Sequence, residues 1–124
     1  MVRIVLVGLG GGIGSIARYC ITSWAQTLLG TTFPWGTAVV NIGGCFLIGF
    51  LITFGMELSS WSEETRLLLI TGFLGGLTTF STFGYETTHA FLERSIALAV
   101  GNIALNLVAG LLAVALGMAV ARML

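Results

Sequence analysis

The stretch Gly72-Phe-Leu-Gly-Gly-Leu-Thr-Thr-Phe-Ser-Thr-Phe-Gly84 interrupts a hydrophobic segment with glycines, hydroxyl side chains and two phenylalanines. Backbone of this kind is tolerated inside a membrane only where protein buries it or where it lines a water-filled path, because unpaired N–H and C=O groups in hydrocarbon cost several kcal/mol each. At about 1.5 Å per residue, a helix that begins after Arg66 reaches the middle of a bilayer near Leu77. We therefore expect that Gly75 and Gly76 loosen this helix, that it is broken at the membrane midplane, and that a functional site lies at the break. In the alternative interpretation, Gly75-Gly76 is only a notch where another helix crosses.

The composition is that of an integral membrane protein. The chain is 56% hydrophobic and 8% charged, whereas soluble domains are about 25% charged, and its mean hydropathy is +1.04. A chain of 124 residues accommodates about four helical spans of about 20 to 25 residues each. We therefore predict one all-α, multi-pass transmembrane domain with spans at about 3–29, 35–56, 66–91 and 96–121. Five arginines and five glutamates give zero net charge and no basic patch for nucleic acid.

The first hydrophobic segment contains a glycine motif that is easily misread. Gly12-Ile-Gly-Ser-Ile-Ala17 matches a dinucleotide-binding fingerprint, but the acidic residue that this motif needs about 20 positions later is missing, since the first carboxylate is Glu57. We also expect no signal peptide here, because the apolar character continues past Arg18 without a convincing polar cleavage region. The glycines instead predict close approach of another helix at two small-xxx-small pairs, Gly8 with Gly12 and Gly10 with Gly14.

Arg18 places a charge well inside the first segment. Such a charge costs about 2.5 to 3.5 kcal/mol at the bilayer centre on insertion scales, and less if the side chain reaches the interface. Two interpretations stay open. Arg18 is either an anchor that snorkels to the interface or a residue of an aqueous vestibule, where it would concentrate anions.

Polar residues form stripes on the second and fourth segments. Thr37, Asn41 and Cys45 lie four apart, so they share one face of the second helix. Asn41 must find partners at that depth, either by bonding another helix or by lining a pore. In the fourth segment, Asn102 and Asn106 begin a polar and small stripe that faces a partner helix or a permeation path.

Phe80 and Phe83 lie three apart and therefore share a helical face. Aromatic residues at this spacing usually belong to a core. A phenyl ring also has a positive edge, so an anion can sit edge-on to it without meeting a full charge that would trap it. Both interpretations stay open for this pair.

Three motifs together carry a family resemblance: Gly11-Gly-Ile-Gly-Ser-Ile-Ala-Arg-Tyr19, Asn41-x-x-Gly44, and Gly72-Phe-x-Gly-Gly-x-Thr-Thr-Phe-Ser-Thr-Phe-Gly-x-Glu86. With its length and four segments, the whole chain resembles the small prokaryotic fluoride channels called the Fluc or CrcB-like family. The resemblance implies an antiparallel, dual-topology homodimer in the plasma (inner) membrane. Two narrow pores would let fluoride leave the cell passively and so relieve its toxicity. This function is transport and not enzymatic catalysis.

The resemblance also implies roles for individual residues. Phe80 and Phe83 would face the pore, and Asn41 would line it. A structural sodium ion would bind at the dimer centre through the main-chain oxygens of Gly75 and Thr78 from both subunits. Four further positions are candidate pore residues with less defined roles: Thr79 and Ser81 in the same polar stretch, and Asn102 and Asn106 in the fourth segment.

The distribution of arginines agrees with insertion in both orientations. With four spans, Arg3, Arg66 and Arg122 share one side of the membrane, and Arg94 lies on the other with Arg18 near the first link. Three arginines against two give a weak orientation bias, since carboxylates contribute little to the positive-inside rule.

Two other functions remain as alternatives. A proton-coupled exporter of the small multidrug-resistance kind also has four helices and dual topology, but it needs a carboxylate in the first segment, and none precedes Glu57. A non-transporting assembly subunit would explain the glycine notches but not a polar break at the midplane.

Overall fold

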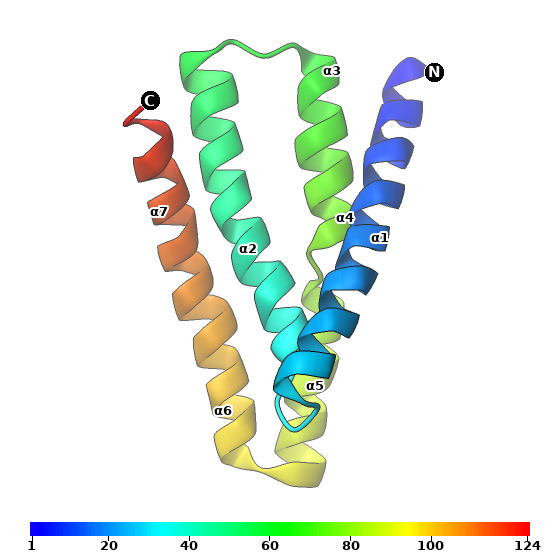
Figure 1. Cartoon of the computed structure of the whole chain (residues 1–124), viewed down its shortest axis with the longest axis vertical. Helices are drawn as coiled ribbons and strands as arrows, with labels where there is room; N and C mark the ends of the chain where they lie inside the picture. Colours follow the sequence, from blue (N-terminus) through cyan, green and yellow to red (C-terminus); the bar gives the residue numbers. More distant parts are fainter.

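The chain folds into four long helices. The computed structural model describes the backbone of residues 1–124 and every side chain except that of Leu58. Four helices are long and apolar enough to cross a membrane: Val2–Leu29, Trp35–Glu57, Glu63–Arg94 and Ile96–Ala121. The prediction of an all-α chain with four helices of this kind is confirmed. The two termini and the connection between the second and third helices lie at one end of the molecule, and the other two connections lie at the opposite end (Figure 1).

Regular α-helix alternates with short π-helical segments within these four helices. The first is α1 (Val2–Leu29), and the second comprises α2 (Trp35–Ile52) and η1 (Thr53–Leu58). The third comprises α3 (Glu63–Arg66), η2 (Leu67–Leu74), α4 (Gly75–Leu77), α5 (Phe80–His89) and η3 (Ala90–Arg94). The fourth comprises α6 (Ile96–Ala104), η4 (Leu105–Ala109) and α7 (Gly110–Ala121).

Glycines let α1 lie directly on the third helix. A Cβ atom at Gly10 would collide with the Leu68 carbonyl, and one at Gly14 with the Phe73 carbonyl. These two positions therefore act as the predicted helix-crossing notch. The other predicted pair does not contact a helix of the same chain, because a Cβ at Gly8 or Gly12 would meet nothing within 4 Å.

Glycines also allow close packing between the second and fourth helices. A Cβ at Gly49 would collide with the Val114 carbonyl, and one at Gly117 with the Phe46 carbonyl. In a membrane, where lipid tails are as apolar as leucine, such close backbone contact supplies van der Waals attraction that burial of apolar area cannot. The two tight helix pairs are thus α1 with η2 and α4, and α2 with α7.

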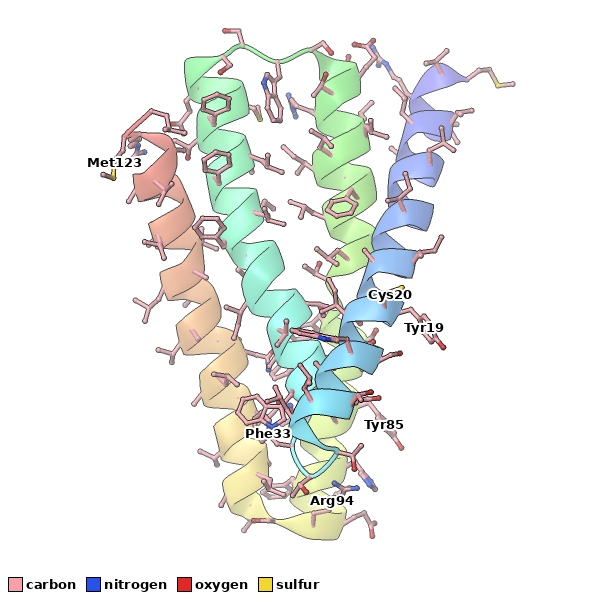
Figure 2. All side chains as sticks on the ribbon, viewed as in Figure 1. Tyr19, Cys20, Phe33, Tyr85, Arg94 and Met123 are labelled. Atoms are coloured by element: carbon pink, nitrogen blue, oxygen red, sulfur yellow. The ribbon has the colours of Figure 1, made fainter. Side chains whose placement is uncertain are left out.

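Except for Arg18 and Glu86, the charged residues lie toward the ends of the four helices. Arg3 pairs with Glu63 at 2.7 Å and Arg122 with Glu57 at 3.6 Å, both exposed and at the end that holds the termini. Figure 2 places Arg94 at the opposite end, where its guanidinium donates to the Thr32 carbonyl at 3.4 Å. Exposed ion pairs contribute at most about 1 kcal/mol, so these contacts align helix ends and add little stability.

Candidate functional site

The third helix is interrupted by two extended residues. Thr78 has φ −86° and ψ 156°, and Thr79 has φ −149° and ψ 112°, between the end of α4 at Leu77 and the start of α5 at Phe80. The interruption is visible as a thin segment between α4 and α5 in Figure 1. It lies within residues 72–84, although not at the glycines.

The expectation that Gly75 and Gly76 loosen the helix is wrong. Gly75 is helical, with φ −63° and ψ −35°, and a Cβ there would meet nothing within 4 Å. Gly76 instead lies against the Gly11 carbonyl, so it serves the packing of α1 that the alternative interpretation described. Neither backbone strain nor close contact within this chain requires glycine at position 75.

Asn41 satisfies the backbone of the interruption. The Thr79 N–H donates to Asn41 Oδ1 at 2.8 Å, and Asn41 Nδ2 donates to the Thr79 carbonyl at 3.1 Å. In an uninterrupted helix, the Thr79 N–H would bond the Gly75 carbonyl four residues earlier. The Asn41 side chain thus replaces a helical hydrogen bond and gives both the N–H and the carbonyl of Thr79 a partner.

Asn41 is also joined to the fourth helix through a series of amides. Asn41 Nδ2 donates to Asn106 Oδ1 at 3.0 Å. Asn106 Nδ2 donates to the carbonyl of Asn102 at 3.0 Å and to Asn102 Oδ1 at 2.9 Å. Asn102 Nδ2 donates to Thr87 Oγ1 of α5 at 2.9 Å. Asn102 and Asn106 are 0% and 8% exposed, so the polar stripe of the fourth helix faces the second and third helices.

Hydroxyl groups cover the start of α5. Thr79 Oγ1 accepts from the Thr82 N–H at 3.2 Å, which makes Thr79 the N-cap of this helix. The same hydroxyl donates to Thr82 Oγ1 at 3.0 Å and lies 3.2 Å from Ser81 Oγ. Ser81 and Thr82 are exposed. The break therefore presents neutral hydroxyl groups outward.

Phe80 and Phe83 lie beside the break. Their ring centroids are 5.5 Å apart, with the planes tilted by 54°. Phe83 is 7% exposed and belongs to the interior, whereas Phe80 is 78% exposed. A hollow of about 450 Å³ runs along this face of the molecule. Its lining includes Asn41, Gly75, Thr78, Thr79, Phe80, Phe83 and Asn106.

Arg18 lines a different hollow. This space, of about 470 Å³, is bordered by Arg18, Thr79, Ser81, Thr82 and Glu86 among others. The half-buried Arg18 donates through Nη1 to the Thr78 carbonyl at 3.3 Å. The cation therefore contacts the backbone of the break itself, a partner that the sequence did not indicate.

Glu86 is a site residue that the sequence did not single out. Thr37 Oγ1 donates to Glu86 Oε1 at 2.8 Å, while Glu86 Oε2 is buried without a hydrogen-bond partner in the described part of the chain. The available signal was a carboxylate on the helix that also carries Thr79, together with a threonine one turn before Asn41 on the facing helix. The sequence could not show that Thr37 bonds Glu86, because it does not give the register between the second and third helices.

No group of three or more His, Cys, Asp or Glu side chains among the described residues could hold a metal ion.

Sequence comparisons agree with this architecture. The family model of the CrcB-like protein, Camphor Resistance (CrcB), matches residues 5–118. A Clostridium perfringens protein named fluoride-specific ion channel FluC is 46% identical, over 97% of this chain and 94% of its own length. Proteins of the same name from Rhizobium johnstonii and Agrobacterium fabrum are 47% and 44% identical, each over at least 98% of both chains. With four span-length helices and a match along nearly its whole length, the chain is a multi-pass membrane protein that belongs to the CrcB-like family.

Proposed function

We propose that this protein is a fluoride-selective channel that lets fluoride leave a prokaryotic cell passively across the inner membrane. Relatives that match nearly the full length are named fluoride-specific ion channels. The observation that carries the proposal is the site itself, where Thr79, Ser81 and Asn41 gather beside Phe80 and Phe83 at a break in the third helix. We place this break at the membrane midplane, since it lies about half-way along the span Glu63–Arg94.

The chemistry of the site suits a small anion. Fluoride is strongly hydrated, so a pore must replace its water with hydrogen-bond donors and still release it. The hydroxyl groups of Ser81 and Thr82 are neutral donors, whereas both N–H groups of Asn41 already bond the Thr79 carbonyl and Asn106 Oδ1. The ring edges of Phe80 and Phe83 add partial positive charge. Arg18, at the neighbouring hollow, would raise the local anion concentration without lying in the narrow part of the path.

We further propose that two copies assemble antiparallel to complete two pores. The exposed Phe80 ring and the exposed Gly75 line a hollow that is open on one side in the single chain, which leaves the site without a second wall. Three arginines lie toward one end of the chain, and two of them are already paired with glutamates, so either orientation in the membrane is accessible.

The backbone at the break fits a structural sodium ion. The Gly75 carbonyl loses its helical partner because the Thr79 N–H bonds Asn41 instead. The Thr78 carbonyl accepts one hydrogen bond from Arg18 and retains a second lone pair. Carbonyl oxygens from two copies would give four neutral ligands, which suit a hard monovalent cation better than a divalent one.

The proposed transport is tested by efflux from liposomes that contain the purified protein. We expect rapid fluoride efflux and no comparable chloride efflux, because a narrow path without a strong fixed charge admits only the smaller anion. Since the proposed transport is passive, fluoride efflux should not depend on an imposed proton gradient. Ion-selective electrodes measure both anions. Equal chloride and fluoride efflux would exclude the channel, and fluoride efflux that requires a proton gradient would favour a coupled exporter.

The phenylalanine pair is tested by replacing each ring with an aliphatic side chain. Phe80→Ile removes the positive ring edge and should lower fluoride efflux at least about fivefold, with little effect on folding because Phe80 is exposed. Phe83→Ile should lower efflux as well, together with some stability, since that ring is buried. Phe91→Ile, which changes another exposed ring on the third helix, is the matched control and should leave efflux unchanged. Unaltered efflux in both site variants would mean that the pair only packs.

The sodium proposal is tested by replacing sodium with a bulky organic cation. Light scattering should show a dimer in sodium, and fluoride efflux should fall when sodium is absent from both sides. Thr78→Ser should behave as wild type, because the proposed ligand is a backbone oxygen. Gly75→Ala should also preserve the fold of each chain, since position 75 is helical with open space for a Cβ. A monomer in sodium would refute the assembly, and efflux that is indifferent to sodium would refute the ion.

A further inference from the structure

The hydrogen bonds that join Asn41 to the fourth helix have a direction that backbone groups determine. The Thr79 N–H can only donate, and the Thr79 carbonyl can only accept. Asn41 must therefore turn Oδ1 toward the former, at 2.8 Å, and Nδ2 toward the latter, at 3.1 Å. This orientation leaves the second N–H of Asn41 to donate to Asn106 Oδ1, at 3.0 Å.

A second backbone group orients Asn106. The carbonyl of Asn102 can only accept, so Asn106 turns Nδ2 toward it at 3.0 Å, and the same Nδ2 donates to Asn102 Oδ1 at 2.9 Å. Asn106 Oδ1 is then the atom that faces Asn41. Asn102 therefore turns Oδ1 toward Asn106 Nδ2, and its own Nδ2 donates to Thr87 Oγ1 at 2.9 Å. The Thr79 backbone and the Asn102 carbonyl therefore select compatible orientations for the Asn41 and Asn106 amides. Reversing either amide would bring two N–H donors or two oxygen acceptors together.

The series leaves Asn41 with no unused N–H. Its Nδ2 has two hydrogens, and these bond the Thr79 carbonyl and Asn106 Oδ1. If Asn106 offered no acceptor, one N–H of the half-buried Asn41 amide would lack a protein partner, and the amide would lose one of the three bonds that fix its orientation. The orientation of the amide at the helix break thus depends on a residue of another helix.

We infer that Asn106 is a positioning residue for permeation: it holds the Asn41 amide in the orientation that the break requires, and Asn102 and Thr87 hold Asn106. This inference rests on the proposed function, and it assigns the asparagines of the fourth helix a role different from direct contact with the anion. Asn102 is fully buried. It therefore acts on the path only through its neighbours.

The inference is tested by a double-mutant cycle on fluoride efflux. Asn106→Leu should lower efflux at least about fivefold, the effect of about one lost buried hydrogen bond, when Asn41 is present. In an Asn41→Ser background, the same substitution should have no further effect, because residues that act through one another are not additive. An equal reduction in both backgrounds, or no reduction in either, would overturn the inference.

A spectroscopic measurement tests the same series without using transport. The chain has three asparagines, at positions 41, 102 and 106, so asparagine-selective 15N labelling of the side chains gives three amide groups and leaves out Gln26. Asn102→Leu should shift the side-chain resonances of Asn41 as well as those of Asn106, although Asn102 and Asn41 share no hydrogen bond among the described residues. A shift confined to Asn106 would overturn the inference, even if Asn106→Leu does not fold or Asn41→Ser efflux is too slow to measure.

Thr53→Val is the matched control for both experiments. Thr53 is another buried polar residue, 0% exposed, but its hydroxyl has no hydrogen-bond partner among the described residues. Removing the Thr53 hydroxyl should alter neither fluoride efflux nor the asparagine resonances. A change as large as that in the asparagine variants would show a general packing effect and overturn the inference. Wild-type protein without fluoride efflux would refute the proposed function alone, because the resonance test of the amide series would still give its result.

Discussion

Every backbone N–H and C=O that lies in the interior of a membrane needs a partner, and this requirement explains the arrangement around Thr79. An extended residue inside a long helix loses the bonds that the helix supplies. Asn41 replaces them by accepting from the Thr79 N–H and donating to its carbonyl. The break therefore persists without unpaired groups, and it releases the Gly75 carbonyl and a set of hydroxyl groups for other use. The proposed anion path and the proposed cation site both follow from this one exchange of partners.

Much of this architecture could be predicted from the sequence because it depends on composition and periodicity. Hydropathy and length predicted four helices, and the polar stretch of residues 72–84 contains the two extended residues of the third helix. The four-residue spacing of Thr37 and Asn41 correctly put both on one face of the second helix, and the structure shows that they bond Glu86 and Thr79 of the third helix. Such patterns give the face that a residue occupies on its own helix. They do not give its partner on the next one.

The details that depend on the register between helices were not predictable. The glycine pair Gly75-Gly76 was expected to loosen the helix, yet the interruption is at Thr78 and Thr79, where Asn41 replaces a helical bond, while Gly76 packs on α1. The contact of Arg18 with the Thr78 carbonyl and the full burial of Asn102 also need three-dimensional alignment of segments distant in sequence. For the asparagines, the spacing of polar residues indicated polar helix faces, but only the structure gave the direction of each hydrogen bond.

Amide hydrogen exchange at the break reports directly whether Asn41 holds the Thr79 N–H. In Asn41→Ala, exchange at Thr79 should accelerate at least about tenfold relative to wild type. Exchange at Thr78 should stay slow, since the Thr78 N–H bonds the Leu74 carbonyl at 3.0 Å within the preceding helix. If Thr79 exchanged equally slowly with and without the Asn41 side chain, another group would satisfy the break, and the role of Asn41 as its backbone partner would be contradicted.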